Sequence, residues 1–244
     1  MQGIFLILSE LKNGFMDYKI KPGINLFNCD CLEFMSTIPD KYFSLCITDP
    51  PYGIGNTTTS AGNKHRKTLH KRVKWNNEIP SKKYFSELYR ISKNQIIWGC
   101  NYFFPYIKVP GRIVHYKKPF QDLEKGKIKF CPCDLASQSF NNRIEYFEYN
   151  WYGNSQNGKV NWDNSGPDAR IHPTQKPIAL YKYLLKKYAK PTDKIIDTHG
   201  GSMSIAIACY DFGCDLVCCE NDKDMFDAAV KRFENHKLQQ TIKF

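Results

Sequence analysis

The chain has no long hydrophobic run, no internal repeat and no low-complexity tract. Residues 1–8 hold only a five-residue apolar run, which is shorter than the hydrophobic region of a signal peptide or a membrane span. No later stretch of the sequence reaches spanning length. We therefore expect a cytoplasmic protein with no membrane partner.

The chain also lacks the paired Cys-x-x-Cys pattern of structural zinc sites, although it has ten cysteines. The most closely spaced are Cys29-x-Cys31, Cys131-x-Cys133 and the adjacent Cys218 and Cys219. Several cysteines lie in apolar runs, where this residue acts as a small hydrophobic side chain. Because disulfides are rare in a reducing cytoplasm, we expect free structural thiols and no metal site.

Acidic residues are in the minority, with 24 Asp and Glu against 35 Lys and Arg. The formal net charge of +11 and the pI of about 9.1 suggest a polyanionic partner, most simply nucleic acid. The alternative is a basic surface that only keeps the protein in solution.

Short apolar runs alternate with helical patterns along most of the 244 residues, a length that suits one α/β domain. We predict strands at 24–28, 45–48, 95–98, 112–116, 194–196 and 215–219, and helices at 31–37, from 81, 178–188, 203–210 and 222–235. This alternation predicts a doubly wound, mostly parallel, Rossmann-like sheet. The pattern is lost between residues 117 and 169, which we interpret as a small inserted region.

Asp49-Pro50-Pro51-Tyr52 follows the apolar run 44–48, so it lies where a buried strand ends. Ligands of open α/β sheets bind at that edge. The Asp49 carboxylate and the Pro50 carbonyl can accept hydrogen bonds from an amino group, and Tyr52 can stack on a planar ring. The segment therefore suggests a grip on the exocyclic amine of a nucleobase. The alternative is an ordinary proline turn.

A second strand end carries Asp197-Thr198-His199-Gly200-Gly201-Ser202, with Glu220 at the end of the next strand, 23 residues after Asp197. An acidic residue at that spacing is placed to bind ribose hydroxyls. The loop is not Gly-x-Gly-x-x-Gly and no P-loop lysine follows, so we expect a ligand with ribose but no pyrophosphate. S-adenosylmethionine fits that description. The alternative is a glycine turn followed by a chance acidic residue.

A third segment, His172-Pro173-Thr174-Gln175-Lys176-Pro177, opens the predicted helix at residue 178. Pro177 suits a first helical turn. Lys176 and its polar neighbours can meet a carboxylate, such as the methionyl end of S-adenosylmethionine. The alternative is a loop with two prolines.

Together these three segments resemble the motifs of the DNA amino-methyltransferases. Their order, with the catalytic segment first and the cofactor loop last, resembles the beta group of that family. Residues 98–103, Trp-Gly-Cys-Asn-Tyr-Phe, are also similar to short phage and bacterial adenine methylases. The resemblance spans Asn28 to Glu220 and implies a class I methyltransferase fold with permuted motif order, encoded by a bacterium or a phage.

By this resemblance, the loop residues that line the cofactor site are Asp197, His199, Gly200, Gly201 and Ser202. Glu220 would hold the ribose, Asp30 would lie near the adenine of the cofactor, and Thr174, Gln175 and Lys176 near its methionyl part. Asp30 is also a good helix N-cap. The usual family loop runs Asp-Pro-Phe-x-Gly-Ser-Gly, whereas this chain has Thr198, His199 and Met203 at three of those positions. His199 is expected to stack on the cofactor or to be an ordinary loop histidine.

The implied catalytic residues are Asp49, Pro50 and Tyr52. Their hydrogen bonds would free the lone pair of the amine for direct methyl transfer, without a covalent intermediate. The target base must leave the duplex to reach them. Carbon-5 methylation of cytosine needs a cysteine nucleophile, and Cys133 lies away from any predicted strand end. Aspartate rather than serine at position 49 resembles the adenine branch.

The segment 53–77, next to the catalytic turn, is rich in basic residues expected to contact DNA phosphates: Lys64, Arg66, Lys67, Lys71, Arg72 and Lys74. The alternative is a solvated loop. The region 117–169 is expected to read the target sequence, with Asn141, Asn142 and Arg143 at base edges. Its aromatic residues, from Tyr146 to Tyr152, are expected mainly to form a small core.

We therefore predict an S-adenosylmethionine-dependent DNA adenine-N6 methyltransferase that acts on double-stranded DNA. One alternative is cytosine-N4 methylation. Another is a DNA-binding protein whose cofactor site is inactive, which the Thr198 and His199 departures would explain. The sequence leaves open the recognition sequence, a homodimer and a cognate restriction endonuclease.

Overall fold

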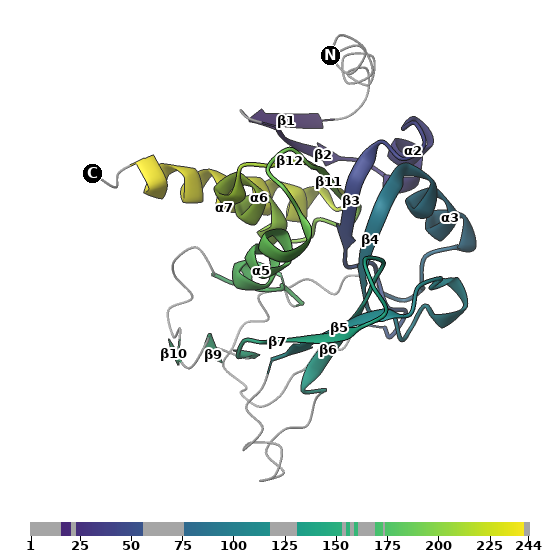
Figure 1. The fold of residues 1–244 in the computed structure, drawn as a ribbon. Coiled ribbons are helices and arrows are strands. Elements are labelled where there is room, and N and C mark those ends of the chain that lie inside the picture. Colours follow the sequence, from purple (N-terminus) through teal and green to yellow (C-terminus); the bar gives the residue numbers. More distant parts are fainter. Residues whose placement is uncertain are drawn as a thin grey trace.

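The computed structural model describes residues 16–20, 23–55, 76–117, 131–152, 155–156, 159–160, 169–172 and 174–241. Within these ranges, nine strands form one sheet (Figure 1). Their order across the sheet is β1 (Met16–Ile20), β2 (Ile24–Asn28), β12 (Asp215–Glu220), β11 (Lys194–Asp197), β3 (Phe43–Thr48), β4 (Ser92–Trp98), β6 (Cys133–Gln138), β5 (Gly111–Tyr116) and β7 (Ile144–Glu148). A separate small sheet is formed by β8 (Trp151–Tyr152), β9 (Ser155–Gln156) and β10 (Lys159–Val160).

Helices cover both faces of the large sheet (Figure 1). α2 (Cys31–Ser36) and α3 (Lys82–Ile91) pack on one face, where Phe34, Phe85 and Leu88 are fully buried. α5 (Ile178–Tyr188), α6 (Ser204–Phe212) and α7 (Lys223–Thr241) pack on the other, with Leu184 and Phe233 in the core. None of the helices in the described ranges combines the length and hydrophobicity needed to cross a membrane.

The order in which strands are added to the sheet reverses between β3 and β11, which are parallel neighbours. From β3 the chain passes through α3 to β4 on one side, whereas from β11 it passes through α6 to β12 on the other. Crossovers that leave in opposite directions open a crevice at the carboxyl ends of the two strands. This topological switch point is therefore where a ligand is expected.

The predicted α/β class with a doubly wound, mostly parallel sheet is confirmed. Three sheet strands were not predicted as such, namely β1, β6 and β7. β6 runs antiparallel to β4 and β5, and β7 runs parallel to β5, so these parts of 117–169 belong to the main sheet. β6 mixes polar and apolar residues, and no residue of β7 is buried, so neither strand forms the continuous apolar run that marks a buried strand in the sequence.

Local signals fix where the helices begin and end. Asp30 caps α2 by accepting the backbone N–H groups of Leu32 and Glu33, and Ser81 caps α3 through Tyr84 N–H. α6 ends at Gly213, whose φ of +83° lies in the left-handed region. That conformation is the usual helix stop at glycine.

Replacing Gly213 tests this stop signal. A Cβ at this position would meet no described atom within 4 Å, so the cost of Gly213→Ala is purely conformational. We expect the free energy of unfolding to fall by about 1 kcal/mol. Gly213→Asn should lose less, since asparagine tolerates the left-handed region. Urea denaturation measures both, and an alanine variant as stable as the wild type would contradict this assignment.

Candidate active site

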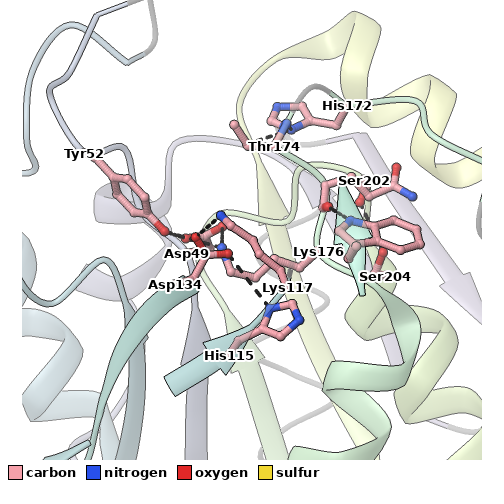
Figure 2. Close-up of polar contacts among 12 residues, drawn as sticks. Asp49, Tyr52, His115, Lys117, Asp134, His172, Thr174, Lys176, Ser202 and Ser204 are labelled. Carbon is pink, nitrogen blue, oxygen red and sulfur yellow. Dashed lines mark hydrogen bonds and ion pairs between the residues drawn. The ribbon is translucent and has the colours of Figure 1, made fainter. Parts of the chain in front are cut away.

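The Asp49 carboxylate lies directly after β3, and both of its oxygens are engaged (Figure 2). Oδ1 accepts a hydrogen bond from the Tyr52 hydroxyl at 2.5 Å. Oδ2 forms an ion pair with Lys176 Nζ, also at 2.5 Å. Pro50 is buried at the bend between the two motif side chains. The turn therefore presents a carboxylate that is already held by one neutral and one charged donor.

The Tyr52 ring is supported by the turn that follows β4. Gly99 has a φ of +72°, and a Cβ there would lie 2.2 Å from Cε1 of Tyr52. Only glycine therefore allows the tyrosine ring to lie this close to the backbone. On the backbone side, Tyr52 N–H donates to Oδ1 of Asn76 at 2.8 Å. Burial and the neighbouring Asp49 charge raise the pKa of Tyr52 well above its ordinary value, so its hydroxyl stays protonated as a donor.

Lys176 is 7% exposed and precedes α5 directly. Burial alone would lower the pKa of its ammonium, but the carboxylates of Asp49 and Asp134 outweigh burial and the net direction is upward. A buried charge of this kind persists only when it is paired. We expected this lysine near the methionyl part of a cofactor, whereas the structure pairs it with Asp49.

The other two residues of that segment lie elsewhere. The Gln175 side chain is buried and bonds to the backbone of Ala169 and Ile171. The backbone carbonyl of Gln175 accepts a hydrogen bond from the Trp151 indole N–H at 2.5 Å. Thr174 is exposed, and its hydroxyl lies 3.1 Å from Nδ1 of His172 (Figure 2). Gln175 thus holds the segment in place, and its side chain is not available to a ligand in this arrangement.

Asp134 was not predicted as a site residue. It lies on β6 and pairs with Lys117, with His115 Nδ1 at 3.9 Å from its second oxygen (Figure 2). Lys176 and Lys117 lower the pKa of Asp134 against the opposing effect of burial. His115 is fully buried, and this burial lowers its pKa to about 4. No local motif marks Asp134, because antiparallel pairing of β6 with β4 brings it to the site.

At the neighbouring strand end, the loop after β11 folds around the buried Asp197. Oδ1 of this carboxyl accepts His199 N–H at 3.0 Å, whereas Oδ2 is buried with no hydrogen-bond partner among the described residues. Burial raises the pKa of Asp197 to about 7, and the charges of Asp49 and Glu220 add to the rise. The carboxyl group is therefore easily protonated near neutral pH.

Glu220 closes the loop from the end of β12. Oε2 accepts the N–H of Gly201 at 2.7 Å, and Oε1 accepts that of Asp222 at 2.8 Å. A carboxylate has about four lone-pair sites, so each oxygen can take a further O–H donor. A Cβ built on Gly201 meets no described atom within 4 Å, which leaves open space beside this carboxylate. These features fit a ligand with vicinal hydroxyl groups.

Two more predicted residues flank this loop. Asp30 is exposed after β2, and Cys29 N–H of the same segment donates to the Glu220 carbonyl at 3.2 Å. Ser202 is buried, and its side chain lies 3.3 Å from the Ser204 hydroxyl (Figure 2). Its carbonyl accepts a hydrogen bond from Arg232 of α7. Asp30 therefore borders the loop, whereas the Ser202 side chain points into a packed helix start.

Thr198 and His199, the departures from the usual family loop, belong to a buried polar network. Thr198 Oγ1 lies 2.8 Å from Thr48 Oγ1, 2.7 Å from the Tyr84 hydroxyl and 3.0 Å from His199 Nδ1. A proline at 198 could make none of these contacts. Since Thr48 immediately precedes Asp49, the network ties the two strand ends of the switch point together. Burial lowers the pKa of His199 to about 4, so its imidazole is neutral near pH 7.

Most of the predicted DNA-binding residues fall in a part of the chain that the structure does not describe. Lys64, Arg66, Lys67, Lys71, Arg72 and Lys74 lie outside the described residues. Arg143 is exposed just before β7, the outermost strand of the sheet. The expected function of 117–169 in target recognition stays a prediction. All ten cysteines are free, and seven of them are buried.

The pKa of Asp197 leads to a test by pH. Between about pH 4 and about pH 7 the folded protein keeps a proton that the unfolded chain releases, so wild-type stability falls as the pH rises through this window. Asp197→Asn lacks this titration. We expect the free energy of unfolding of the variant, relative to wild type, to rise by about 2–4 kcal/mol across the window and then to level off.

Guanidinium denaturation at several pH values measures this difference. His199, whose lowered pKa produces the opposite slope at acid pH, is present in both proteins and cancels. Parallel stability curves for the two proteins would contradict a raised pKa at Asp197.

Comparison with known proteins agrees with this arrangement. Residues 112–231 match a family model described as DNA methylase, of the N6/N4 type. The solved structure of the PvuII DNA methyltransferase, which is cytosine-N4-specific, has a TM-score of 0.56 at 13% identity over 88% of this chain and 90% of that chain. A candidate DNA modification methylase from Thermus thermophilus, solved with S-adenosyl-L-methionine, has a TM-score of 0.50 at 13% identity over 85% of this chain and 93% of that chain.

The two similar structures show the fold. The family model adds a match in sequence pattern over residues 112–231. The family model begins within β5, covers β11 and β12 and ends within α7, so it includes the loop after β11 and Glu220. Residues 112–231 of this chain carry the sequence pattern of the N6/N4 family of DNA methylases.

Proposed function

We propose that this chain transfers a methyl group from S-adenosylmethionine to the N6 amine of a flipped-out adenine in double-stranded DNA. One observation carries the proposal. The Asp49 carboxylate and the loop after β11, which Glu220 closes, lie at neighbouring positions on one edge of the sheet. The 2.8 Å contact between Thr48 and Thr198 joins them. An amine acceptor and a ribose acceptor at one switch point suit a reaction between a base and a nucleoside cofactor.

Residues of two strand ends would hold the cofactor. Glu220 would accept hydrogen bonds from the ribose hydroxyls, since both of its oxygens keep lone-pair capacity. Gly200 and Gly201 would let the ligand approach the backbone, with Asp30, His199 and Ser202 around them. Thr174 would lie near the methionyl end, with Gln175 beside it holding the segment in place through its own hydrogen bonds. S-adenosylmethionine, when bound, supplies an activated methyl group.

Asp49 and Pro50 would act on the target amine. The lone pair of an exocyclic amine is delocalised into the ring, which makes this nitrogen a poor nucleophile. Hydrogen bonds from the amine to Asp49 and to the Pro50 carbonyl favour a pyramidal nitrogen with a free lone pair. Burial would lower the pKa of Lys176, but its acidic neighbours raise it, so this side chain keeps a positive charge beside Asp49. Positioning and electrostatics would supply most of the rate gain.

The identity of the target base rests on the motif. Aspartate at position 49 favours adenine over cytosine, and no cysteine nucleophile is needed for either amine. The likeness to a cytosine-N4-specific enzyme keeps cytosine-N4 as the second candidate. Both reactions use the same acceptor geometry and differ in the size of the base that Tyr52 must meet.

One assay separates the candidates. DNA is incubated with the protein and S-adenosylmethionine carrying a deuterated methyl group, then digested to nucleosides for mass spectrometry. We expect labelled N6-methyladenine from the wild type and none from Asp49→Ala. Labelled N4-methylcytosine would overturn the choice of adenine. DNA binding without any label in wild-type reactions would favour an inactive DNA-binding protein.

The basic segment makes a separate prediction. If Lys71 and Arg72 contact phosphates, replacing both with alanine removes two charge contacts and releases fewer counterions on binding. The slope of log K against log salt concentration should become shallower by about 2. Equilibrium binding to duplex DNA at several salt concentrations measures the slope. Lys83→Ala/Lys93→Ala, two exposed lysines outside this segment, is the matched control. Equal slopes for wild type and the Lys71/Arg72 variant would argue against phosphate contact.

A further inference from the structure

The Tyr52 ring is stacked on a second tyrosine that no motif assigned to the site. Tyr102 lies in the turn after β4, with ring centroids 4.9 Å apart and an interplanar angle of 15°. Its residue exposure is 41%, whereas the following Phe103 is fully buried. Phe103 packs against Phe85 and meets the edge of the Tyr52 ring. The turn is therefore anchored by Phe103 and presents Tyr102 to solvent.

The two rings differ in their freedom to move. Tyr52 lies against Gly99, and its backbone N–H is held by Asn76. Its hydroxyl is bonded to Asp49. The exposed side chain of Tyr102 contributes only its ring face to the stack. Tyr102 is therefore the less restrained ring of the pair, since Gly99 and Asn76 hold Tyr52 in place.

The two donors on Asp49 differ in the same way. Lys176 is buried, charged and attracted also by Asp134, so its bond to Oδ2 is the stronger. The Tyr52 hydroxyl is a neutral donor to Oδ1. An incoming amine is also a neutral donor, so it can replace the hydroxyl on Oδ1 at little cost while the ion pair stays in place.

We propose that Tyr52 and Tyr102 are the two walls of the slot for the flipped base, and that their stack is the closed form of that slot. The proposal rests on the proposed function. The rings separate by about 3.4 Å, the stacking height of one base. The base takes the place of the tyrosine–tyrosine contact, and its amine takes the place of the Tyr52 hydroxyl on Asp49. Flipped bases are commonly held between aromatic or apolar side chains, and each such stack contributes substantially to affinity.

The role of Tyr102 as the second wall of the slot is tested by combining a change in the protein with a change in the DNA. Once the modified base has been located, two duplexes are compared, one intact and one abasic at that position. We expect Tyr102→Ala to weaken binding of the intact duplex by about ten- to a hundredfold, the effect of losing one base stack. Binding of the abasic duplex should be unchanged, and Tyr102→Phe should match wild type on both.

Equal loss on both duplexes would overturn the proposal, since it would mean that Tyr102 only supports the turn. Tighter binding of the intact duplex by Tyr102→Ala would also overturn it, because Tyr102 would then compete with the base.

Tyr52→Phe tests the exchange on Asp49. This variant keeps the ring and removes the competing hydroxyl, so the intact duplex should bind several-fold more tightly and the abasic duplex as before. Weaker binding of the intact duplex would overturn the exchange. The wild-type mass-spectrometric assay distinguishes these failures from failure of the proposed function, because wild type would then leave no labelled base at all.

Discussion

The parallel pairing of β3 with β11 is the contact on which the site depends. Ile195 and Ile196 pair with Leu45 and Cys46, although about 150 residues separate the strands along the chain. Because both strands end at the same edge, Asp49 and Asp197 emerge side by side with no contribution from any loop. The Thr48–Thr198 contact then joins the two strand ends two residues beyond the last pair of the β3–β11 ladder. A reaction that joins two separately bound molecules needs such fixed spacing more than it needs a special catalytic group.

The charged groups of this site are partly or fully buried, so water screens the interactions between them only weakly. The carboxyl groups of Asp49, Asp134 and Asp197 act on the buried ammonium of Lys176, and Glu220 acts on Asp197. This lysine helps to keep Asp134 ionised, whereas burial raises the pKa of Asp197 to about 7. The same edge thus contains acids with opposite pKa shifts. A protonated Asp197 carries no charge that would repel Asp49 and Glu220.

Sequence alone predicted the parts of this arrangement that are local. The apolar runs before Asp49 and Asp197, the cap at Asp30, the helix start at residue 81 and the acidic residue at the end of β12 all follow from short-range rules. The partner of Lys176 could not be predicted, because it depends on how α5 is docked rather than on the segment itself. Asp134 was missed for a similar reason, since only the antiparallel return of β6 brings it near. Tyr102 lay in a recognised segment, but its stacking on Tyr52 requires the positive φ of Gly99.

Pro177 has a further effect through the residue before it. It stands at the start of α5 with φ of −70°, and a proline restricts the preceding residue to extended conformations. The range of backbone conformations open to Lys176 is therefore already restricted in the unfolded chain. Less conformational entropy is lost when its ammonium reaches Asp49 on folding. The long, flexible side chain of a lysine normally makes a buried ion pair entropically expensive. Here the rigidity of the next residue offsets part of that expense before folding begins.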